Sequence, residues 1–286
     1  PSGAGKSSIL KLIYGNYRCD EGQILVRQGD AIIDIASAPP RQILSVRQRA
    51  LGYVTQFLRA VPRVSALDIV AEPLVMRSVP REIATVRAAD ILRRFNVPER
   101  LWSLPPATFS GGEQQRINLA RGLLPEHPIL LLDEPTASLD ASIKGVILDL
   151  LMALVRDTGA SLVIMSHDLR MVARRCARIL VMYGGRVVET GDSREVFSAP
   201  RHPYTQALVR AAAGNEGPGG RLEPIPGVPP VLHRRSADCA FASRCVHAQP
   251  ICRRERPADV AVEGRVVACH FALGGLPIPV AVEEGT

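Results

Sequence analysis

ILLLDEPTASLD, residues 129–140, is the stretch that decides the fold, and SGGEQQR, residues 110–116, lies about one helix upstream of it. The apolar run at 129–132 predicts a buried parallel strand, which delivers Asp133 and Glu134 to the carboxyl end of a sheet, where such folds bind ligands. One acid can hold magnesium while the other orients water. A strand entering an ordinary turn could also end in two acids, but the upstream block and a third motif favour a site.

The third motif opens the chain, because PSGAGKSS matches the end of the pattern GxxxxGK[ST]. Backbone amides of such a loop cradle phosphates at a helix N-terminus, the Lys reaches the β and γ oxygens, and the hydroxyl holds magnesium. The candidate nucleotide-binding residues are Ser2, Gly3, Ala4, Gly5, Lys6, Ser7 and Ser8, of which Ser7 is also a magnesium ligand. The glycines of an ordinary turn are the alternative.

The start of the chain leads to a further expectation. The first Gly of the pattern would precede residue 1 and no initiator Met is present, so we expect the sequence to begin inside the motif. The strand that feeds the loop would then be missing. We therefore expect the chain as given to be a poor ATPase, since phosphate positioning requires rigid support.

Length and composition agree with an α/β protein. A chain of 286 residues can bury a full core and still carry an appendage. No apolar stretch approaches the ~20 residues needed to cross a bilayer and no secretory segment is recognisable, so a membrane role needs a partner. The formal net charge of +7 is dominated by Arg and dispersed along the chain, which favours a solvated surface over specific nucleic-acid binding.

The remaining pattern places the other elements. Apolar residues recur at helical intervals over residues 64–104, and LGYVTQ at 51–56 is typical of a strand that ends in a Gln. SLVIM at 161–165 predicts another buried strand, with His167 following at its end. Residues 178–189 contain a hairpin pattern around Tyr-Gly-Gly.

Together these motifs identify the chain as a member of the ABC ATPases. The resemblance implies an α/β P-loop NTPase of ABC type, with a mostly parallel sheet core, a helical subdomain and a small Cys-containing C-terminal extension. It also implies an upstream aromatic residue that stacks on adenine. Gln56 would be the Q-loop residue, which contacts magnesium or the attacking water and reports to a partner subunit.

The mechanism expected from these residues is phosphoryl transfer to water, which needs positioning and charge neutralisation above all. Lys6, Ser7, Asp133 and magnesium hold the triphosphate of ATP, and Glu134 polarises the water. His167 contacts the γ-phosphate and stabilises the developing charge; a structural His at a strand end is the alternative.

The SGG turn opens a helix whose amides and dipole suit an anion. By resemblance, that helix faces the nucleotide of a second ABC ATPase domain in a homodimer or heterodimer. The residues concerned are Ser110, Gly111, Gly112 and Glu113 at the signature, and Ser138, Leu139 and Asp140 at the shared seam. The usual signature is Leu-Ser-Gly-Gly-Gln; here Phe109 replaces the Leu and Glu113 the Gln, which adds negative charge near a phosphate site and puts the rate in doubt.

The two halves resemble different relatives. Residues 1–141 resemble the ABC protein of the phosphonate carbon-phosphorus lyase system, through the motifs YGNY (14–17), QFLRAVPRVSA (56–66), NVPERLW (96–102) and FSGGEQQR (109–116). Residues 142–286 resemble ATPase subunits of oligopeptide and dipeptide importers, through HPYTQAL (202–208) and PGVPP (226–230). Either a fusion of two related ATPases or a divergent clade would explain this.

The expected domains are an ABC ATPase domain at 1–212, with its helical subdomain at about 64–125, a Gly-rich linker at 213–222 and an importer-type extension at 223–286. Four of the six cysteines cluster in this extension: Cys239, Cys245, Cys252 and Cys269. Such a cluster is more typical of metal or redox ligands than of cytosolic disulfides. The resemblance implies an iron-sulfur cluster, although the spacing lacks a CxxC pair and four buried free thiols are the alternative. Cys19 and Cys176 are expected to fill the core.

The function that follows is the ATP-hydrolysing subunit of an ABC importer for peptides or similar solutes. Its partners would be transmembrane permease subunits and, indirectly, a substrate-binding protein, and it would lie in the cytoplasm against the inner face of the membrane. The alternative is a soluble ATPase of the carbon-phosphorus lyase system. A DNA-repair ABC ATPase would need a long insertion between Ser8 and Ser110, for which the intervening residues leave no room.

Overall fold

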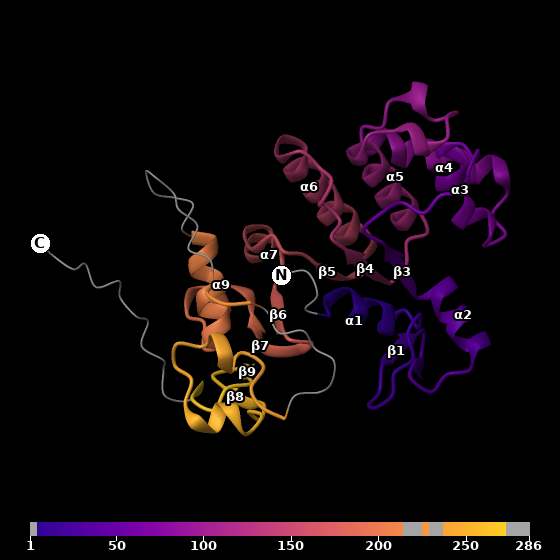
Figure 1. Ribbon diagram of the computed structural model, residues 1–286. Helices are drawn as coiled ribbons and strands as arrows, with labels where there is room; N and C mark the ends of the chain where they lie inside the picture. The colour runs from indigo at the N-terminus through magenta and orange to yellow at the C-terminus, as the bar shows by residue number, and fades with distance from the viewer. Residues whose placement is uncertain (1–4, 214–224, 229–236, 273–286) are drawn as a thin grey trace, which may run out of the picture. The chain divides into compact units, whose positions relative to one another are not determined.

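The computed structural model describes residues 5–213, 225–228 and 237–272 (Figure 1). The chain divides into two compact units, one formed by Ser7–Ser166 and the other by Pro1–Lys6 with His167–Thr286.

The first unit contains most of the predicted motifs. In chain order its elements are α1 (Lys6–Ile13), β1 (Leu25–Gln28), β2 (Ala31–Asp34), α2 (Pro40–Arg49), β3 (Leu51–Val54), α3 (Ala66–Val75), α4 (Arg81–Arg94), η1 (Glu99–Leu101), η2 (Pro106–Thr108), α5 (Gly111–Leu123), β4 (Ile129–Asp133), α6 (Ala141–Thr158) and β5 (Ser161–Met165).

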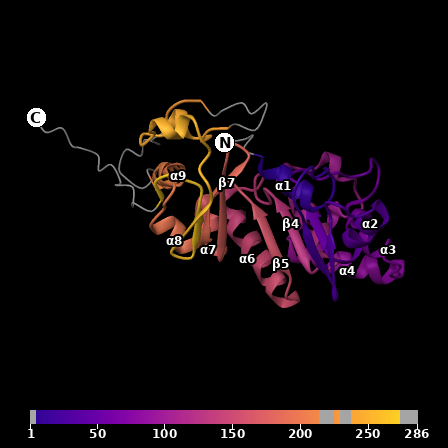
Figure 2. The same ribbon diagram turned by 90° about the horizontal axis from the view of Figure 1, so that it is seen from below.

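A parallel sheet with the order β3-β4-β5 forms the centre of this unit. Leu130, Leu131 and Leu132 on β4 are almost completely buried, because β4 has a strand on each side (Figure 2). The buried parallel strand predicted at 129–132 is therefore confirmed. A parallel strand also forms at 161–165, but β5 is the last strand of this sheet and none of its residues is buried, so the prediction that it is buried is wrong. β1 and β2 form a separate antiparallel hairpin.

Helices α3, α4 and α5 pack on one another, as Figure 1 shows, and confirm the helical region predicted over residues 64–104. α5 also lies close against β3: a Cβ at Gly122 would stand 2.3 Å from a methyl group of Val54. Glycine at this position therefore permits the helix to approach the sheet edge that carries the predicted site.

The second unit is built on an antiparallel sheet with the order β6-β7-β9-β8. Its elements are α7 (Leu169–Arg175), β6 (Arg178–Tyr183), β7 (Arg186–Asp192), α8 (Ser193–Ser198), α9 (Pro203–Ala213), η3 (Ala242–Arg244), η4 (Pro250–Arg253), β8 (Val260–Val262) and β9 (Arg265–Val267).

The hairpin predicted at 178–189 is β6–β7. Its two turn residues, Gly184 and Gly185, have φ angles of 56° and 73°, the left-handed conformation that a tight hairpin turn requires. Beside the hairpin, the rings of Tyr183, Tyr204 and Phe241 meet with centroids 4.5–5.4 Å apart. The core of this unit thus contains residues of the β6–β7 hairpin, of α9 and of the C-terminal extension.

Some expectations do not hold or fall outside the described residues. Cys19 and Cys176 are half-buried rather than buried, so the prediction that they fill the core is wrong. α9 extends to Ala213, and the rest of the predicted linker lies outside the described residues. Among the described residues, no helix combines the length and the apolar character needed to span a membrane.

Candidate functional site

Asp133, the last residue of β4, is 5% exposed and has a hydroxyl group at each carboxylate oxygen. Ser7 Oγ, in the first turn of α1, donates to Asp133 Oδ1 over 3.0 Å. The hydroxyl of Tyr53, on β3, donates to Asp133 Oδ2 over 3.4 Å. A hydroxyl and a carboxylate from two distant motifs thus converge, and these are the hard oxygen ligands that Mg²⁺ prefers. Two of the three residues predicted to hold magnesium, Ser7 and Asp133, therefore fit that ion.

Glu134 follows β4 with a backbone conformation that is unusual for its residue type. Its φ is 49°, in the left-handed region that non-glycine residues rarely adopt, and its amide donates to the carbonyl of Met165 on β5 over 2.9 Å. The chain therefore turns sharply at the carboxyl edge of the sheet. Local strain of this kind clusters at functional sites, which agrees with the predicted catalytic role.

The signature residues form the N-terminus of α5. Ser110 is the N-cap, and its hydroxyl accepts from the amide of Glu113 over 3.3 Å. In return, Glu113 Oε2 accepts from the Ser110 amide at 2.9 Å and from the Ser110 hydroxyl at 2.8 Å. These hydrogen bonds from Ser110 lower the pKa of Glu113. The residue that departs from the usual signature is therefore part of a capping box, an arrangement that the sequence analysis did not predict.

The signature and the predicted seam lie together in this unit. A Cβ on Gly111 would stand 3.5 Å from Ser138 Cβ, and a Cβ on Gly112 would stand 3.4 Å from the Ser138 carbonyl oxygen and 3.8 Å from Leu139. Ser110, Gly111 and Ser138 are exposed. Asp140, also exposed, is the N-cap of α6 but makes no side-chain capping bond.

Two buried amides on α5 were missed by sequence reasoning. Gln115 Nε2 donates to the carbonyl of Pro135 over 2.9 Å, and Asn118 Nδ2 donates to the carbonyl of Thr55 over 2.6 Å. The first bond holds the loop after Glu134 and the second holds the chain just before Gln56. Two amide side chains spaced i, i+3 on a helix with a buried face are the pattern that could have revealed them.

The structure describes the other predicted residues to different extents. Gln56 is half-buried directly after β3, and Ser8 is exposed on α1. Gly5, Lys6 and His167 fall in the second unit, and the structure does not fix their distances to Asp133. Ser2, Gly3 and Ala4 lie outside the described residues.

The four clustered cysteines converge within the second unit. Cys239, Cys245, Cys252 and Cys269 line one small cavity, together with three histidines, His202, His247 and His270. Burial, and then the charges that the other three thiols would carry as thiolates, raise the pKa of Cys269 to about 11. In the part of the chain that the structure describes, no three His, Cys, Asp or Glu side chains are placed to hold a single metal ion. Burial also raises the pKa of Cys239 and Cys245, so a metal that binds these thiols would have to displace their protons.

Comparison with protein families and curated proteins adds independent information. The family model "ABC transporter" matches residues 1–137, and the model "Oligopeptide/dipeptide transporter, C-terminal region" matches residues 188–252. The probable peptide ABC transporter ATP-binding protein y4tS of Sinorhizobium fredii is 34% identical over 99% of this chain and 84% of its own length. The oligopeptide transport ATP-binding protein OppD of Salmonella typhimurium is 32% identical over 94% of this chain and 81% of its own length. The dipeptide transport ATP-binding protein DppD of Escherichia coli is 40% identical, over 65% of this chain and 58% of its own length.

Two solved structures share the fold. The dimeric post-hydrolysis structure of the ATP-binding cassette MJ0796, bound to ADP and Pi, has a TM-score of 0.63 and 29% identity, and covers 68% of this chain and 83% of that one. A second dimeric structure of MJ0796, described as a bacterial ABC transporter cassette, has a TM-score of 0.62 and 31% identity with the same coverage.

Proposed function

We propose that this chain, which belongs to the ATP-binding proteins of ABC transporters, powers the import of peptides. It is an ABC-type ATPase, which binds ATP with Mg²⁺ and acts as the ATP-hydrolysing subunit of an importer. The peptide substrate is supported by one observation above all: a peptide-transporter relative aligns with 99% of the chain, so both halves match one protein of that kind. The importer-type model at residues 188–252 adds to this.

The proposed chemistry assigns one task to each residue around Asp133. Ser7 and Asp133 would hold magnesium, which supplies positive charge to the triphosphate, and Lys6 would contact the β and γ oxygens. Glu134 would accept the proton of the attacking water, with Gln56 and His167 orienting water and phosphate. The hydrogen bond between Ser7 and Asp133 supports this assignment, because it brings together the two motifs that would bind the metal.

A second cassette would complete the site. The exposed Ser110 and Gly111 present the N-terminus of α5 outward, next to the exposed Ser138. The positive end of a helix dipole suits the phosphates of a nucleotide held by the opposing subunit. That the MJ0796 cassette was solved as a dimer supports the same assembly for this chain.

The permease would dock in a groove of about 600 Å³ on the first unit, lined in part by Arg59, Val61, Glu72, Val75 and Met76. Val61, Val75 and Met76 are 61%, 42% and 72% exposed, which is a large apolar surface to leave in water. The groove is also linked to the nucleotide site, because its wall continues the segment that follows Gln56. Binding there would place the chain at the inner face of the membrane, as a peripheral subunit in the cytoplasm.

The cysteine cavity would hold an iron-sulfur cluster. Its support is the convergence of four thiols from separate parts of the extension on one space. When bound, the cluster would supply positively charged iron ions, which stabilise the four cysteine sulfurs as thiolates. Purified without oxygen, the protein should be brown and contain iron and sulfide, and Cys245→Ser should remove both. A colourless preparation without iron would leave the cysteines as free thiols.

The resemblance of residues 1–141 to the carbon-phosphorus lyase protein stays a prediction, as does the division into an ATPase domain at 1–212, a linker at 213–222 and an extension at 223–286. The family model of the C-terminal region begins at residue 188, upstream of that boundary.

A growth experiment separates the two functions. The gene is deleted in an amino-acid auxotroph, and growth is measured on a dipeptide as the source of the required amino acid and on methylphosphonate as the only phosphorus source. We expect growth on the dipeptide to be lost and to return with the parental gene but not with Glu134→Gln. Growth that fails only on methylphosphonate would refute peptide import and support the lyase alternative.

A further inference from the structure

The C-terminal extension joins the sheet of the second unit through a very short ladder. β9 pairs with β7 only at Glu189↔Val267 and Thr190↔Val266. The amide of Ala268, just beyond β9, adds a bond of 2.9 Å to the carbonyl of Val188. So few backbone bonds define a register weakly, and side chains must fix how the extension sits on β7.

Arg265, at the start of β9, supplies the main side-chain contact. It is 6% exposed, and its Nη1 donates to the carbonyls of Ala199 at 2.6 Å and Glu195 at 3.2 Å. The same nitrogen lies 3.9 Å from Glu189 Oε1, and Arg265 Nε lies 3.7 Å from Glu195 Oε2. An arginine of the extension thus enters a site of acids and carbonyls on β7 and α8.

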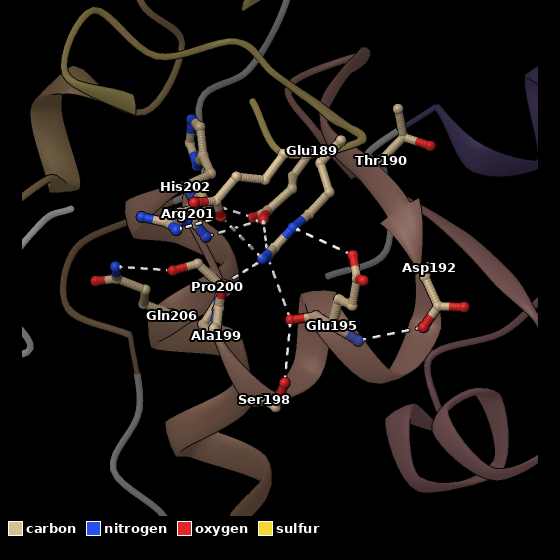
Figure 3. A network of polar contacts seen from close by, with 12 residues as sticks. Glu189, Thr190, Asp192, Glu195, Ser198, Ala199, Pro200, Arg201, His202 and Gln206 are labelled. Carbon is tan, nitrogen blue, oxygen red and sulfur yellow. Dashed lines mark hydrogen bonds and ion pairs between the residues drawn. The ribbon is translucent and has the colours of Figure 1, made fainter. Parts of the chain in front are cut away.

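Glu189, on β7, is completely buried and is the acceptor to which the chain before α9 binds (Figure 3). Its two carboxylate oxygens accept from the amides of Arg201 at 2.8 Å and His202 at 3.0 Å. Arg201 in turn pairs with Glu263, in the turn between β8 and β9. The charges therefore complement each other in both directions, and the Arg265 guanidinium lies 3.9 Å from a buried carboxylate that also binds the amides at the start of α9.

His202 connects this network to the cysteine cavity. The ring is 1% exposed, its Nδ1 accepts from the amide of Tyr204 at 3.0 Å, and it hydrogen-bonds to the backbone of Ala268. The same ring lines the cavity, and Cys269 directly follows Ala268. His202 thus contacts Glu189 through its backbone amide and lines the cysteine cavity with its ring.

We propose that Arg265 is a latch that couples the state of the cysteine cavity to the position of His202 and the start of α9. Removing its charge takes the Arg265 guanidinium away from the buried carboxylate of Glu189, so β9 separates from β7 and the Ala268–Cys269 segment moves away from His202. Coupling of this kind is reciprocal. If the Arg265 contacts protect the cavity thiols from modification, then a group attached to those thiols must weaken the contacts around His202 by the same free energy. Arg265 and His202 are then positioning residues, through which the start of α9 responds to the thiols.

Thiol alkylation tests the latch on the metal-free chain, so its result does not depend on peptide import or on a cluster. Rates of reaction with N-ethylmaleimide are measured by mass spectrometry at Cys252, which is 7% exposed, and at Cys269. We expect Arg265→Met to raise both rates by roughly tenfold or more, as loss of one partner of a buried ion pair does. Arg253→Met, at an exposed arginine of η4, should change them less than about twofold.

Cys19 and Cys176 act as internal references. Equal acceleration at all these thiols would mean general unfolding, and unchanged rates at Cys252 and Cys269 would mean that no latch exists; either result overturns the proposal. The double variant Glu189→Gln/Arg265→Met, which removes both charges, should recover part of the protection. As the reciprocal measurement, alkylation of the parental cavity thiols should speed hydrogen exchange at the amides of Arg201, His202 and Tyr204. Undisturbed exchange there would refute the coupling.

Discussion

The hydroxyl of Ser7 donates a hydrogen bond of 3.0 Å to Oδ1 of Asp133, across 126 positions of sequence. The first turn of α1 and the end of β4 are therefore in direct contact. Because the Tyr53 hydroxyl contacts Oδ2, both oxygens have a partner and the orientation of the Asp133 carboxylate is fixed. The arrangement is prepared for a cation, and the predictions below start from it.

Tyr53→Phe removes only the hydroxyl that contacts Asp133 Oδ2. Because this hydrogen bond is long, we expect a modest effect: binding of Mn²⁺ in the presence of a non-hydrolysable ATP analogue, followed by electron paramagnetic resonance, should weaken by roughly 2- to 5-fold. Tyr17→Phe is the control, since Tyr17 is 49% exposed and its hydroxyl contacts Lys11. Equal metal affinity in all three proteins would show that Tyr53 does not position Asp133.

Glu134→Gln should bind ATP and dimerise but hydrolyse ATP about 10²- to 10⁴-fold more slowly, because an amide cannot accept the proton of the attacking water. Nucleotide binding by fluorescence and phosphate release in the assembled transporter measure the two effects separately. Turnover at the parental rate would exclude Glu134 as the base.

Glu113→Gln tests the residue that departs from the usual signature. Glutamine can still accept from the Ser110 amide, while the negative charge at the N-terminus of α5 is removed. We expect a few-fold gain in ATP-dependent dimerisation, measured by light scattering with Glu134→Gln as the background. Glu113→Ala also removes the charge but loses the capping box, which should destabilise the helix by about 1 kcal/mol. Weaker dimerisation in Glu113→Gln would mean that the carboxylate assists the partner site.

Stability should fall as the pH drops below neutrality. Burial lowers the pKa of His202 to about 4, against an opposing hydrogen bond to Ala268, and burial with the nearby charge of Arg77 lowers the pKa of His127 to about 4. Between pH 6.5 and 4 the unfolded chain therefore binds protons that the folded chain does not. The stabilisation is complete above pH 6.5 and is lost as the pH falls toward 4.

For His202 this loss corresponds to roughly 3 kcal/mol at pH 4. Urea unfolding between pH 7.5 and 4.5 measures it, and His202→Gln should flatten the dependence in the second unit. An unchanged slope would show that His202 protonates as readily in the folded chain as in the unfolded one.

Local patterns predicted the sheet strands and the hairpin because their causes are local. The apolar runs at 129–132 and 161–165 are bounded by turn residues, and Gly184-Gly185 suits only a tight turn. The capping box of Glu113 is also local. It was not predicted because Glu113 was interpreted only as a negative charge near a phosphate site. The pair of Arg265 and Glu189 could not be predicted, since its partners meet only after β9 has paired with β7. A contact between residues that are far apart in the sequence produces no periodic pattern from which it could be predicted.

Helix α5 carries three backbone anchors on one face. Gln115 holds the carbonyl of Pro135, Asn118 holds that of Thr55, and Arg121 holds that of Arg59 in the groove. Since these side chains are spaced three residues apart on a rigid helix, the loop after Glu134, the chain before Gln56 and the groove wall cannot shift independently. A movement of the groove wall would therefore be transmitted through α5 to the loop after Glu134 and to the chain before Gln56 at the same time.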